Sequence, residues 1–258
     1  MVILSPHRDD AAFSLCLSMS RWACLGIRVR VVNFFTQSVY APRAAVQEAA
    51  AISLLRERED RAALLAVDPT IETKSFRFLD APLRLSISAK DVFSRPADHS
   101  VEDRLIATIS GFVRNNLILS PLGLGDHVDH LAVRSAAVSA CRSLGNLGFY
   151  EDLPYATWMT EKALNNRVEE SGASLRPVVI RAEKPLWAKR RIVALYRSQI
   201  TPQEADLIAR FTSRYGGERI WLPNRLARVL RQTANRDRST SQKEQIPPRA
   251  RTRSIRSR

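Results

Sequence analysis

The chain has 258 residues, of which 45% are hydrophobic and 26% are charged, and its formal net charge is +14. These values are typical of a soluble globular protein with room for one large α/β domain. The three cysteines are an odd number without Cys-x-x-Cys spacing, which argues against a disulfide framework and indicates a reduced, cytoplasmic compartment. We expect all three to be buried as small hydrophobic residues.

The segment 11–27 is apolar enough to resemble a signal peptide or a membrane span. However, it follows two aspartates, carries Arg21 in its middle and lacks the basic start of a secretory signal. It is also shorter than the roughly 18 apolar residues that a span requires. We therefore expect a buried helix of a cytoplasmic protein and no membrane span.

The positive charge is concentrated at the C-terminal end. Residues 224–258 contain ten Arg and one Lys against two acidic residues, a net charge of +9, so the rest of the chain carries only +5. After Leu230 the segment is almost devoid of large apolar residues and cannot bury enough surface to offset its ordering entropy. We predict a folded domain over residues 1–223 and a basic tail over 224–258 that is disordered beyond about Arg231.

A basic tail can attract nucleic acid or an anionic membrane surface. This one has no aromatic residue for base stacking and no recognisable binding module. We therefore expect a solvated extension and no nucleic-acid partner.

Strand and helix signals alternate along residues 1–223. Short apolar runs rich in β-branched or aromatic residues predict strands, and apolar positions three and four residues apart predict helices. The predicted elements, in chain order, are a strand at 1–5, a helix at 12–25, a strand at 28–35, a helix at 44–67, a strand at 75–79, a helix at 101–114, a strand at 116–121, a helix at 131–144, strands at 147–150 and 178–181, and helices at 184–198 and 202–215. This order predicts an α/β fold that is Rossmann-like, with a mostly parallel, doubly wound sheet and helices on both faces.

Three of the four histidines lie in two short polar motifs. Residues 5–10 read Ser-Pro-His-Arg-Asp-Asp, and residues 125–130 read Gly-Asp-His-Val-Asp-His. Each motif follows a predicted strand, and ligands of open parallel sheets collect at the carboxyl ends of the strands. Catalytic zinc is usually held by three histidine or carboxylate ligands with one position open. Together the motifs predict a metal-dependent hydrolase.

The spacing within the motifs supports this interpretation. His7 and Asp10 are three residues apart, as are the two histidines of the second motif, so each pair lies on one face of a helix start. Glycines at 123 and 125 let the backbone turn tightly near a ligand. Taken singly, a histidine beside a carboxylate is more often a hydrogen-bonding residue, and an Asp-Asp pair is often a helix N-cap. Two such motifs, each after an apolar strand, favour the metal site.

The same residues resemble the PIG-L/LmbE-like zinc N-deacetylase family. Residues 5–10 are similar to its Pro-His-Pro-Asp-Asp signature, and residues 127–130 to its second motif, His-x-Asp-His. Weaker similarities lie at 56–60, 79–80, 150–155 and 196–199. The resemblance therefore extends over about residues 2–222 and excludes the tail.

This resemblance implies roles for six residues. The zinc ligands, for one ion per chain, are His7, Asp10 and His130. Asp9 is the general base, His127 stabilises the developing oxyanion or protonates the leaving amine, and Asp129 tunes the charge of His127. The chemistry is coherent without the family, because zinc lowers the pKa of bound water to roughly 7 and a carboxylate can accept the proton.

Three further residues are expected to contact the substrate. Arg56 resembles a family position that faces the pocket, although a surface charge paired with Glu59 or Asp60 is an equal alternative. Arg8 stands where the family usually has proline, and it either points to solvent or meets an anionic substrate. Asp80 follows the third predicted strand.

We therefore predict a zinc-dependent N-deacetylase that hydrolyses an N-acetyl group from an amino sugar or glycoconjugate, its expected partner. Zinc follows from the resemblance, since the ligand types alone also admit iron, cobalt or manganese. Two alternatives stay open: a zinc amidase for another N-acyl substrate, and a non-catalytic binding protein whose basic tail engages nucleic acid. The sequence is silent on oligomeric state.

Overall fold

The computed structural model describes residues 1–94, 98–141, 145–170 and 174–230. Within these residues seven strands form one sheet in the order β3-β2-β1-β4-β5-β7-β6. The strands are β1 (Val2–Ser5), β2 (Arg30–Asn33), β3 (Glu72–Ser75), β4 (Ile118–Pro121), β5 (Leu147–Tyr150), β6 (Leu175–Arg181) and β7 (Gly217–Pro223). The first five strands are parallel, and β7 is antiparallel to both of its neighbours. The mostly parallel sheet is confirmed, but the sheet as a whole is mixed.

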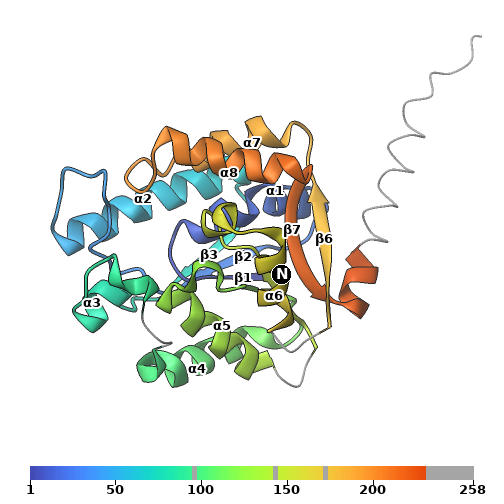
Figure 1. Cartoon of the computed structure of the whole chain (residues 1–258), viewed down its shortest axis with the longest axis horizontal. Helices are drawn as coiled ribbons and strands as arrows, with labels where there is room; N and C mark the ends of the chain where they lie inside the picture. Colours follow the sequence, from blue (N-terminus) through green and yellow to red (C-terminus); the bar gives the residue numbers. More distant parts are fainter. Residues whose placement is uncertain (95–97, 142–144, 171–173, 231–258) are drawn as a thin grey trace, which may run out of the picture.

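Helices cover both faces of the sheet, as predicted (Figure 1). The helices are α1 (Asp10–Cys24), α2 (Ala49–Val67), α3 (Ala81–Leu85), α4 (Glu102–Val113), α5 (Val128–Cys141), α6 (Glu161–Glu169), α7 (Pro185–Val193) and α8 (Pro202–Arg214). Helices α1, α2, α7 and α8 pack together on one face, and α4 and α5 pack on the other. In the described part of the chain, no helix combines the length and the apolar character needed to cross a bilayer.

Strand β1 supplies side chains to both cores. Its sequence is wholly buried, and the pleat turns alternate side chains to opposite faces. Ile3 packs into the core beneath α1, α7 and α8, while Val2 and Leu4 pack into the core beneath α4 and α5. A central parallel strand buried on both faces is a rigid base for the polar turn that follows it.

Strand β7 was not predicted, because two of its residues are charged. Glu218 and Arg219 interrupt the apolar pattern, yet both side chains are buried. Glu218 accepts hydrogen bonds from the N–H groups of Leu17 and Ser18, where α1 is interrupted, and it forms a buried ion pair with Lys189. Arg219 pairs with two glutamates, Glu151 and Glu161. Tertiary pairing of this kind leaves no signal in the local sequence pattern.

Other boundaries differ from the predictions for similar reasons. Strand β3 is an exposed edge strand of polar residues, so the apolar signal came from Phe76 and Phe78, which pack just beyond it. Helix α6 was missed because only two of its residues are buried. The helix predicted from residue 44 begins at Ala49.

Two compositional predictions also change. Cys24 is exposed, whereas Cys16 and Cys141 are buried as expected. Residues 224–230, which we assigned to the tail, are helical, and Ala227 packs into the core. The predicted disorder beyond Arg231 lies outside the described residues.

Candidate active site

The turn after β1 fixes the first motif at the carboxyl edge of the sheet. Ser5 Oγ donates to the carbonyl oxygen of His7 at 2.5 Å and accepts the N–H of Ala11 at 3.1 Å. The backbone N–H of His7 donates to Asp10 Oδ2 at 2.7 Å. Asp9 precedes α1 but makes no side-chain capping bond, which removes the N-cap explanation for the aspartate pair.

The second motif follows β4 through a glycine-dependent turn. Gly123 and Gly125 have φ values of 77° and 78°, a region that favours glycine, so the predicted tight turn is confirmed. A Cβ at Gly125 would lie 2.7 Å from Cγ of Tyr155, so the turn also needs glycine for close packing. Helix α5 then begins at Val128 and carries His130 in its first turn.

His130 is held by one carboxylate and directed at another. Its Nδ1 lies 2.6 Å from Oδ1 of Asp152, a residue just after β5 whose other oxygen accepts two backbone N–H groups, those of Gly123 and Leu124. Its Nε2 lies 3.3 Å from Asp10 Oδ2 but forms no hydrogen bond with any described residue, although it is buried. A carboxylate that accepts the ring N–H of a metal-ligating histidine fixes the tautomer and the orientation of that ring.

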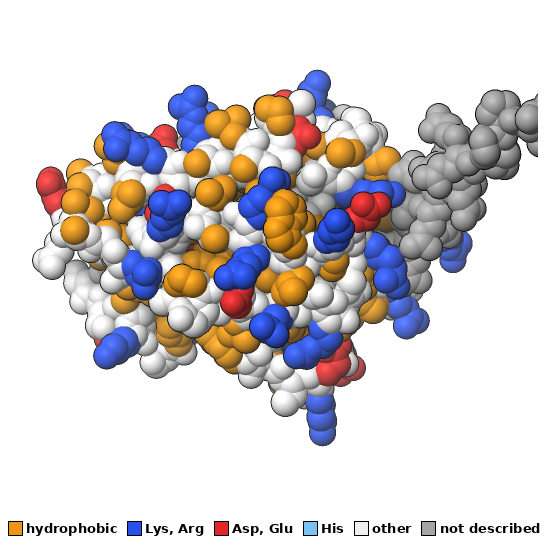
Figure 2. Space-filling model, turned by 90° about the horizontal axis from the view of Figure 1, so that it is seen from above, with side chains coloured by type: hydrophobic (Ala, Val, Ile, Leu, Met, Phe, Trp, Pro, Cys, Tyr) orange, Lys and Arg blue, Asp and Glu red, His pale blue; other side chains and the backbone are white. Residues whose placement is uncertain are grey.

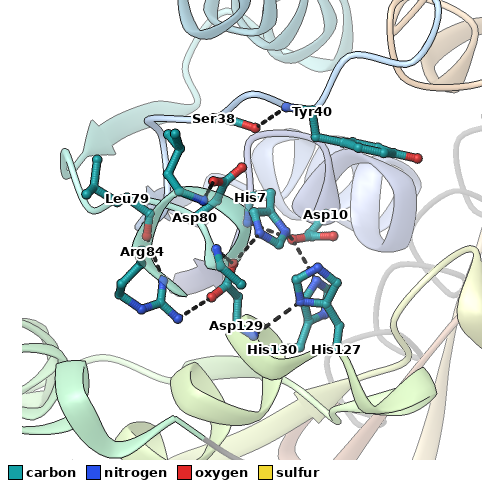
Figure 3. A network of polar contacts seen from close by, with 12 residues as sticks. His7, Asp10, Ser38, Tyr40, Leu79, Asp80, Arg84, His127, Asp129 and His130 are labelled. Atoms are coloured by element: carbon teal, nitrogen blue, oxygen red, sulfur yellow. Dashed lines mark hydrogen bonds and ion pairs between the residues drawn. The ribbon is translucent and has the colours of Figure 1, made fainter. Parts of the chain in front are cut away.

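His7 repeats the same arrangement (Figure 3). Its Nε2 lies 3.0 Å from Oδ2 of Asp129, and its Nδ1 lies 3.3 Å from Oδ2 of Asp10. Burial alone would lower the pKa of His7, but the hydrogen bonds of Asp10 and Asp129 outweigh burial and raise this pKa to about 10. Burial would raise the pKa of Asp10, yet the charges of His130 and His7 hold that pKa below its usual range.

Asp129 contacts a second histidine besides the one we predicted. Its Oδ2 contacts His7 and accepts the N–H of Ala81 at 3.0 Å, and its Oδ1 accepts a hydrogen bond from Arg84 at 2.8 Å. Its backbone N–H donates to His127 Nδ1 at 3.2 Å. Burial and the charges of His7 and His130 lower the pKa of His127, and the charge of Asp129 acts in the opposite direction. The carboxylate therefore orients His7, a contact that we did not predict, and its effect on the charge of His127 stays a prediction.

Among the described residues, two sets of three side chains could hold a metal ion. One comprises His7, Asp10 and His130, and the other comprises His7, His127 and Asp129, each with donor atoms within 4.8 Å of one another. The second set is disfavoured because both oxygens of Asp129 already accept hydrogen bonds. The first set fits a metal: Asp10 Oδ2 faces two histidine nitrogens, and the buried Nε2 of His130 has no other partner among the described residues.

His127 lines the cavity beside this set. Because Nδ1 accepts the N–H of Asp129, the proton of the neutral ring is carried by Nε2. Burial, followed by the charges of His7 and His130, lowers the pKa of His127 well below its ordinary value. His127 is therefore suited to donate a hydrogen bond as a neutral imidazole.

Asp9 and Arg56 form an ion pair in the same cavity. Arg56 Nη2 lies 3.1 Å from Asp9 Oδ1, and its Nη1 donates to Ser38 Oγ and to the carbonyl oxygen of Tyr40. Arg56 therefore faces the cavity, as predicted, and is not a surface charge. The hydrogen bonds among the described residues leave Oδ2 of Asp9 to accept a proton.

Of the two other residues predicted to contact the substrate, one lines the cavity and the other does not. Asp80 lines the cavity and caps α3, with Oδ1 accepting the N–H of Leu83 at 3.2 Å. Arg8 does not line the cavity, and its buried guanidinium is directed to Glu57 and Ser75. Neither predicted environment of Arg8, solvent or an anionic substrate, agrees with this position.

The cavity has a volume of about 280 Å³, near the lower end of the roughly 300–1,000 Å³ of small-molecule sites. Its lining includes His7, Asp9 and Asp10 of the first motif. It also includes five aromatic side chains that we did not predict: Phe13, Tyr40, Phe93, Tyr155 and Trp158. The sequence also gave no role to Asp152 or Arg84. Asp152 follows a predicted strand at the edge that carries both motifs, and that position is a signal that could have identified it. Arg84 lies on a five-residue helix, and we find no such signal for it.

Residues 2–141 match a family model described as PIG-L, GlcNAc-PI de-N-acetylase. The chain belongs to the PIG-L family. A curated relative, the 2'-N-acetylparomamine deacetylase of Streptomyces fradiae, is 30% identical over 160 residues, which cover 60% of this chain. The match spans only 57% of that relative's length.

Solved structures of PIG-L-like deacetylases share the fold. A deacetylase–teicoplanin complex superposes with a TM-score of 0.63 at 23% identity, over 86% of this chain and 96% of the other. A zinc-inhibited form of the teicoplanin deacetylase Orf2 gives a TM-score of 0.59 at 23% identity, over 85% and 96% of the two chains. At these identities the superpositions establish the fold alone.

Proposed function

We propose that this PIG-L family protein is a metal-dependent N-deacetylase that removes the acetyl group from an N-acetylated amino sugar. One observation carries the proposal: the buried Nε2 of His130 has no hydrogen-bond partner among the described residues and faces Asp10, while Asp152 fixes the rest of the ring. The relative that deacetylates 2'-N-acetylparomamine supports the type of substrate.

His7, Asp10 and His130 would hold one zinc ion. When bound, zinc supplies an acidified water molecule and polarises the acyl oxygen. The two histidines are pre-oriented by their own carboxylates, Asp129 and Asp152, so little rearrangement is needed to bind the ion.

The remaining steps belong to Asp9 and His127. Asp9 Oδ2 accepts the proton released as water attacks the acyl carbon, while Arg56 keeps the carboxylate in place through Oδ1. His127 donates its Nε2 hydrogen to the oxyanion that develops on the acyl oxygen, since its Nδ1 is occupied by a backbone N–H. The proton held by Asp9 then passes to the leaving amine, which departs as acetate forms.

Acetate release tests the proposal. The purified protein would be assayed with N-acetylglucosamine and its glycosides, with and without a chelator, and its zinc content would be determined in parallel. We expect about one zinc per chain and release that stops when the metal is removed. Release of longer acyl groups but not acetate would instead favour an amidase, and chelator-resistant release would contradict the metal-dependent mechanism.

A further inference from the structure

Arg84 is directed into the protein rather than toward solvent. Figure 2 shows how Lys and Arg side chains are spread over the outside of the molecule. The side chain of Arg84, in contrast, is only 11% exposed, and its guanidinium lies 4.8 Å from the centre of the Phe35 ring. Arg84 is not among the residues that line the cavity. A guanidinium loses its hydration when it is buried, so the acceptors around it indicate what it does.

Three acceptors hold this guanidinium in one orientation. Its Nε donates to Asp98 Oδ2 at 2.6 Å. Its Nη1 donates to the carbonyl oxygen of Leu79 at 2.6 Å, and its Nη2 donates to Asp129 Oδ1 at 2.8 Å (Figure 3). Asp98 is fixed in turn, because its Oδ1 accepts the N–H of Ser100 at 2.8 Å. The planar fork of arginine suits such a junction, since an ammonium group cannot present rigid donors in three directions.

The bond to Asp129 is the one that leads to the metal set. The side chain of Asp129 is fully buried, and its Oδ2 lies 3.0 Å both from His7 Nε2 and from the N–H of Ala81. Among the described residues, Arg84 is the donor recorded for Oδ1. Without Arg84 this buried oxygen would lose its hydrogen bond, and the carboxylate could turn away from His7.

His7 offers its other ring nitrogen to the proposed metal set. Its Nδ1 lies 3.3 Å from Asp10 Oδ2, while Asp129 holds Nε2. A carboxylate that holds one nitrogen of a ligating histidine fixes the orientation of the ring, and its loss typically lowers metal affinity about 10- to 100-fold. The contacts therefore run without a gap from Arg84 through Asp129 to His7.

We propose that Arg84 is a positioning residue for the metal ligand His7 and that it acts through Asp129. The inference rests on the proposed function, which assigns the metal to a set that includes His7. Arg84 has two effects of opposite sign on that metal. Its positive charge opposes the binding of a divalent cation, whereas its hold on Asp129 favours binding by orienting His7. The proposal is that orientation outweighs charge.

Zinc affinity, measured by competition with a chelating dye, separates the two effects. Arg84→Gln removes both the charge and the fork, and we expect affinity to decrease about three- to tenfold, less than for the loss of a carboxylate that contacts the ligand itself. Arg84→Lys keeps the charge but not the fork, and a similar decrease is expected. If Arg84 acted through its charge alone, Arg84→Gln would bind zinc more tightly and Arg84→Lys would bind it as the wild type does. That pair of results would overturn the proposal.

A double-mutant cycle tests the route through Asp129. In the Asp129→Asn protein, Arg84→Gln should leave zinc affinity nearly unchanged, because the contact through which Arg84 acts is already altered. Losses of affinity that simply multiply would overturn this route. The visible absorption of the cobalt-loaded protein gives a second readout, since it depends on the geometry of the ligands. We expect the spectrum of Arg84→Lys to differ from that of the wild type.

Two controls separate positioning from a general loss of stability. Arg104→Gln removes another guanidinium that lies over a phenylalanine ring, 4.6 Å from the centre of Phe78, but that has no recorded bond to a carboxylate of the described residues. Val178→Ala opens a gap in the core beside β6, the edge strand farthest from β3 in the sheet. Both controls should keep the zinc affinity and the cobalt spectrum of the wild type. Equal losses of affinity in Val178→Ala and Arg84→Gln would overturn the inference.

The same measurements distinguish failure of the inference from failure of the proposed function. Zinc binding without acetate release would count against the deacetylase activity alone, and the Arg84 variants would still decide the inference. Wild-type zinc affinity in both Arg84→Gln and Arg84→Lys would overturn the inference and leave the proposed function standing. A wild-type protein that binds no zinc would overturn both.

Discussion

The floor and the mouth of the cavity are built on different principles. By the floor we mean the proposed metal set of His7, Asp10 and His130, of which His7 and Asp10 line the cavity. All three side chains are buried, and each histidine is fixed by its own carboxylate. By the mouth we mean the cavity-lining residues Trp158 and Phe93, which lie on short 3-10 segments and are largely open to solvent. The proposed metal ligands follow rigid parallel strands, whereas the exposed rings lie in connecting segments, where contacts that distinguish one substrate from another are usually found.

The largest effect should come from Asp9, the proposed general base. Asp9→Asn keeps the proposed metal ligands but removes the base, so kcat should fall about 10²- to 10⁴-fold while zinc content is unchanged. Steady-state acetate release and metal analysis of the same sample measure both quantities. The exposed Glu183→Gln variant serves as the control, and a near-normal kcat in a zinc-loaded Asp9→Asn protein would contradict the assigned role.

A smaller effect should follow when the carboxylate that holds the proposed metal ligand His130 is altered. In Asp152→Asn the residue beside His130 Nδ1 loses its charge, and metal affinity should decrease roughly 10- to 100-fold. Competition with a chelating dye measures this affinity. Because Asp152 also accepts the N–H groups of Gly123 and Leu124, thermal unfolding of the metal-free proteins is needed to separate lost affinity from lost stability. An unchanged metal affinity would count against the support role.

Gly125 joins the two regions, because it lies in the turn that leads to α5 and His130. It also packs against Tyr155, whose ring lies between those of His130 and Trp158. Gly125→Ala should destabilise the protein by about 1–2 kcal/mol from its positive φ alone. Urea unfolding measures this loss. Gly111→Ala is the matched control, because a Cβ there meets nothing within 4 Å and helix α4 should gain about 0.5–1 kcal/mol. Equal effects of the two substitutions would show that the turn is not strained.

The smallest effect concerns the cysteines, none of which lines the cavity. Burial raises the pKa of Cys16 to about 12 and that of Cys141 to about 11, so both thiols stay protonated and weakly nucleophilic at pH 8. Cys24 is exposed. Iodoacetamide should therefore add one group per native chain, at Cys24, without loss of activity. Mass spectrometry of peptides measures the sites, and modification of Cys16 in the native protein would contradict its burial.

The sequence predicted the floor far better than the mouth. His7, Asp10 and His130 follow strands β1 and β4, whose apolar runs are easily recognised, so strand topology alone brings them together. The direction of the Asp129 carboxylate could not be predicted, because it depends on Arg84 and on the backbone of Ala81, which are distant in sequence. Phe93 and Trp158 carry no local pattern that separates a cavity wall from a core residue.

The same limit applies to the fold. The five parallel strands were predicted because they are apolar or lie between clear helices. The third was predicted at 75–79 instead of Glu72–Ser75, because its own sequence is polar. Strand β7 was missed because Glu218 and Arg219 are neutralised by partners elsewhere in the chain. Local patterns identify elements that bury apolar surface, and they fail where buried charges are paired through tertiary contacts.

The central claim is that His7, Asp10 and His130, and not the alternative set with His127 and Asp129, hold the metal. The most direct test is the zinc content of His130→Ala and His127→Ala, purified side by side with the wild type. We predict about one zinc per chain in wild type and in His127→Ala, and none in His130→Ala. Zinc retained by His130→Ala and lost from His127→Ala would contradict the account.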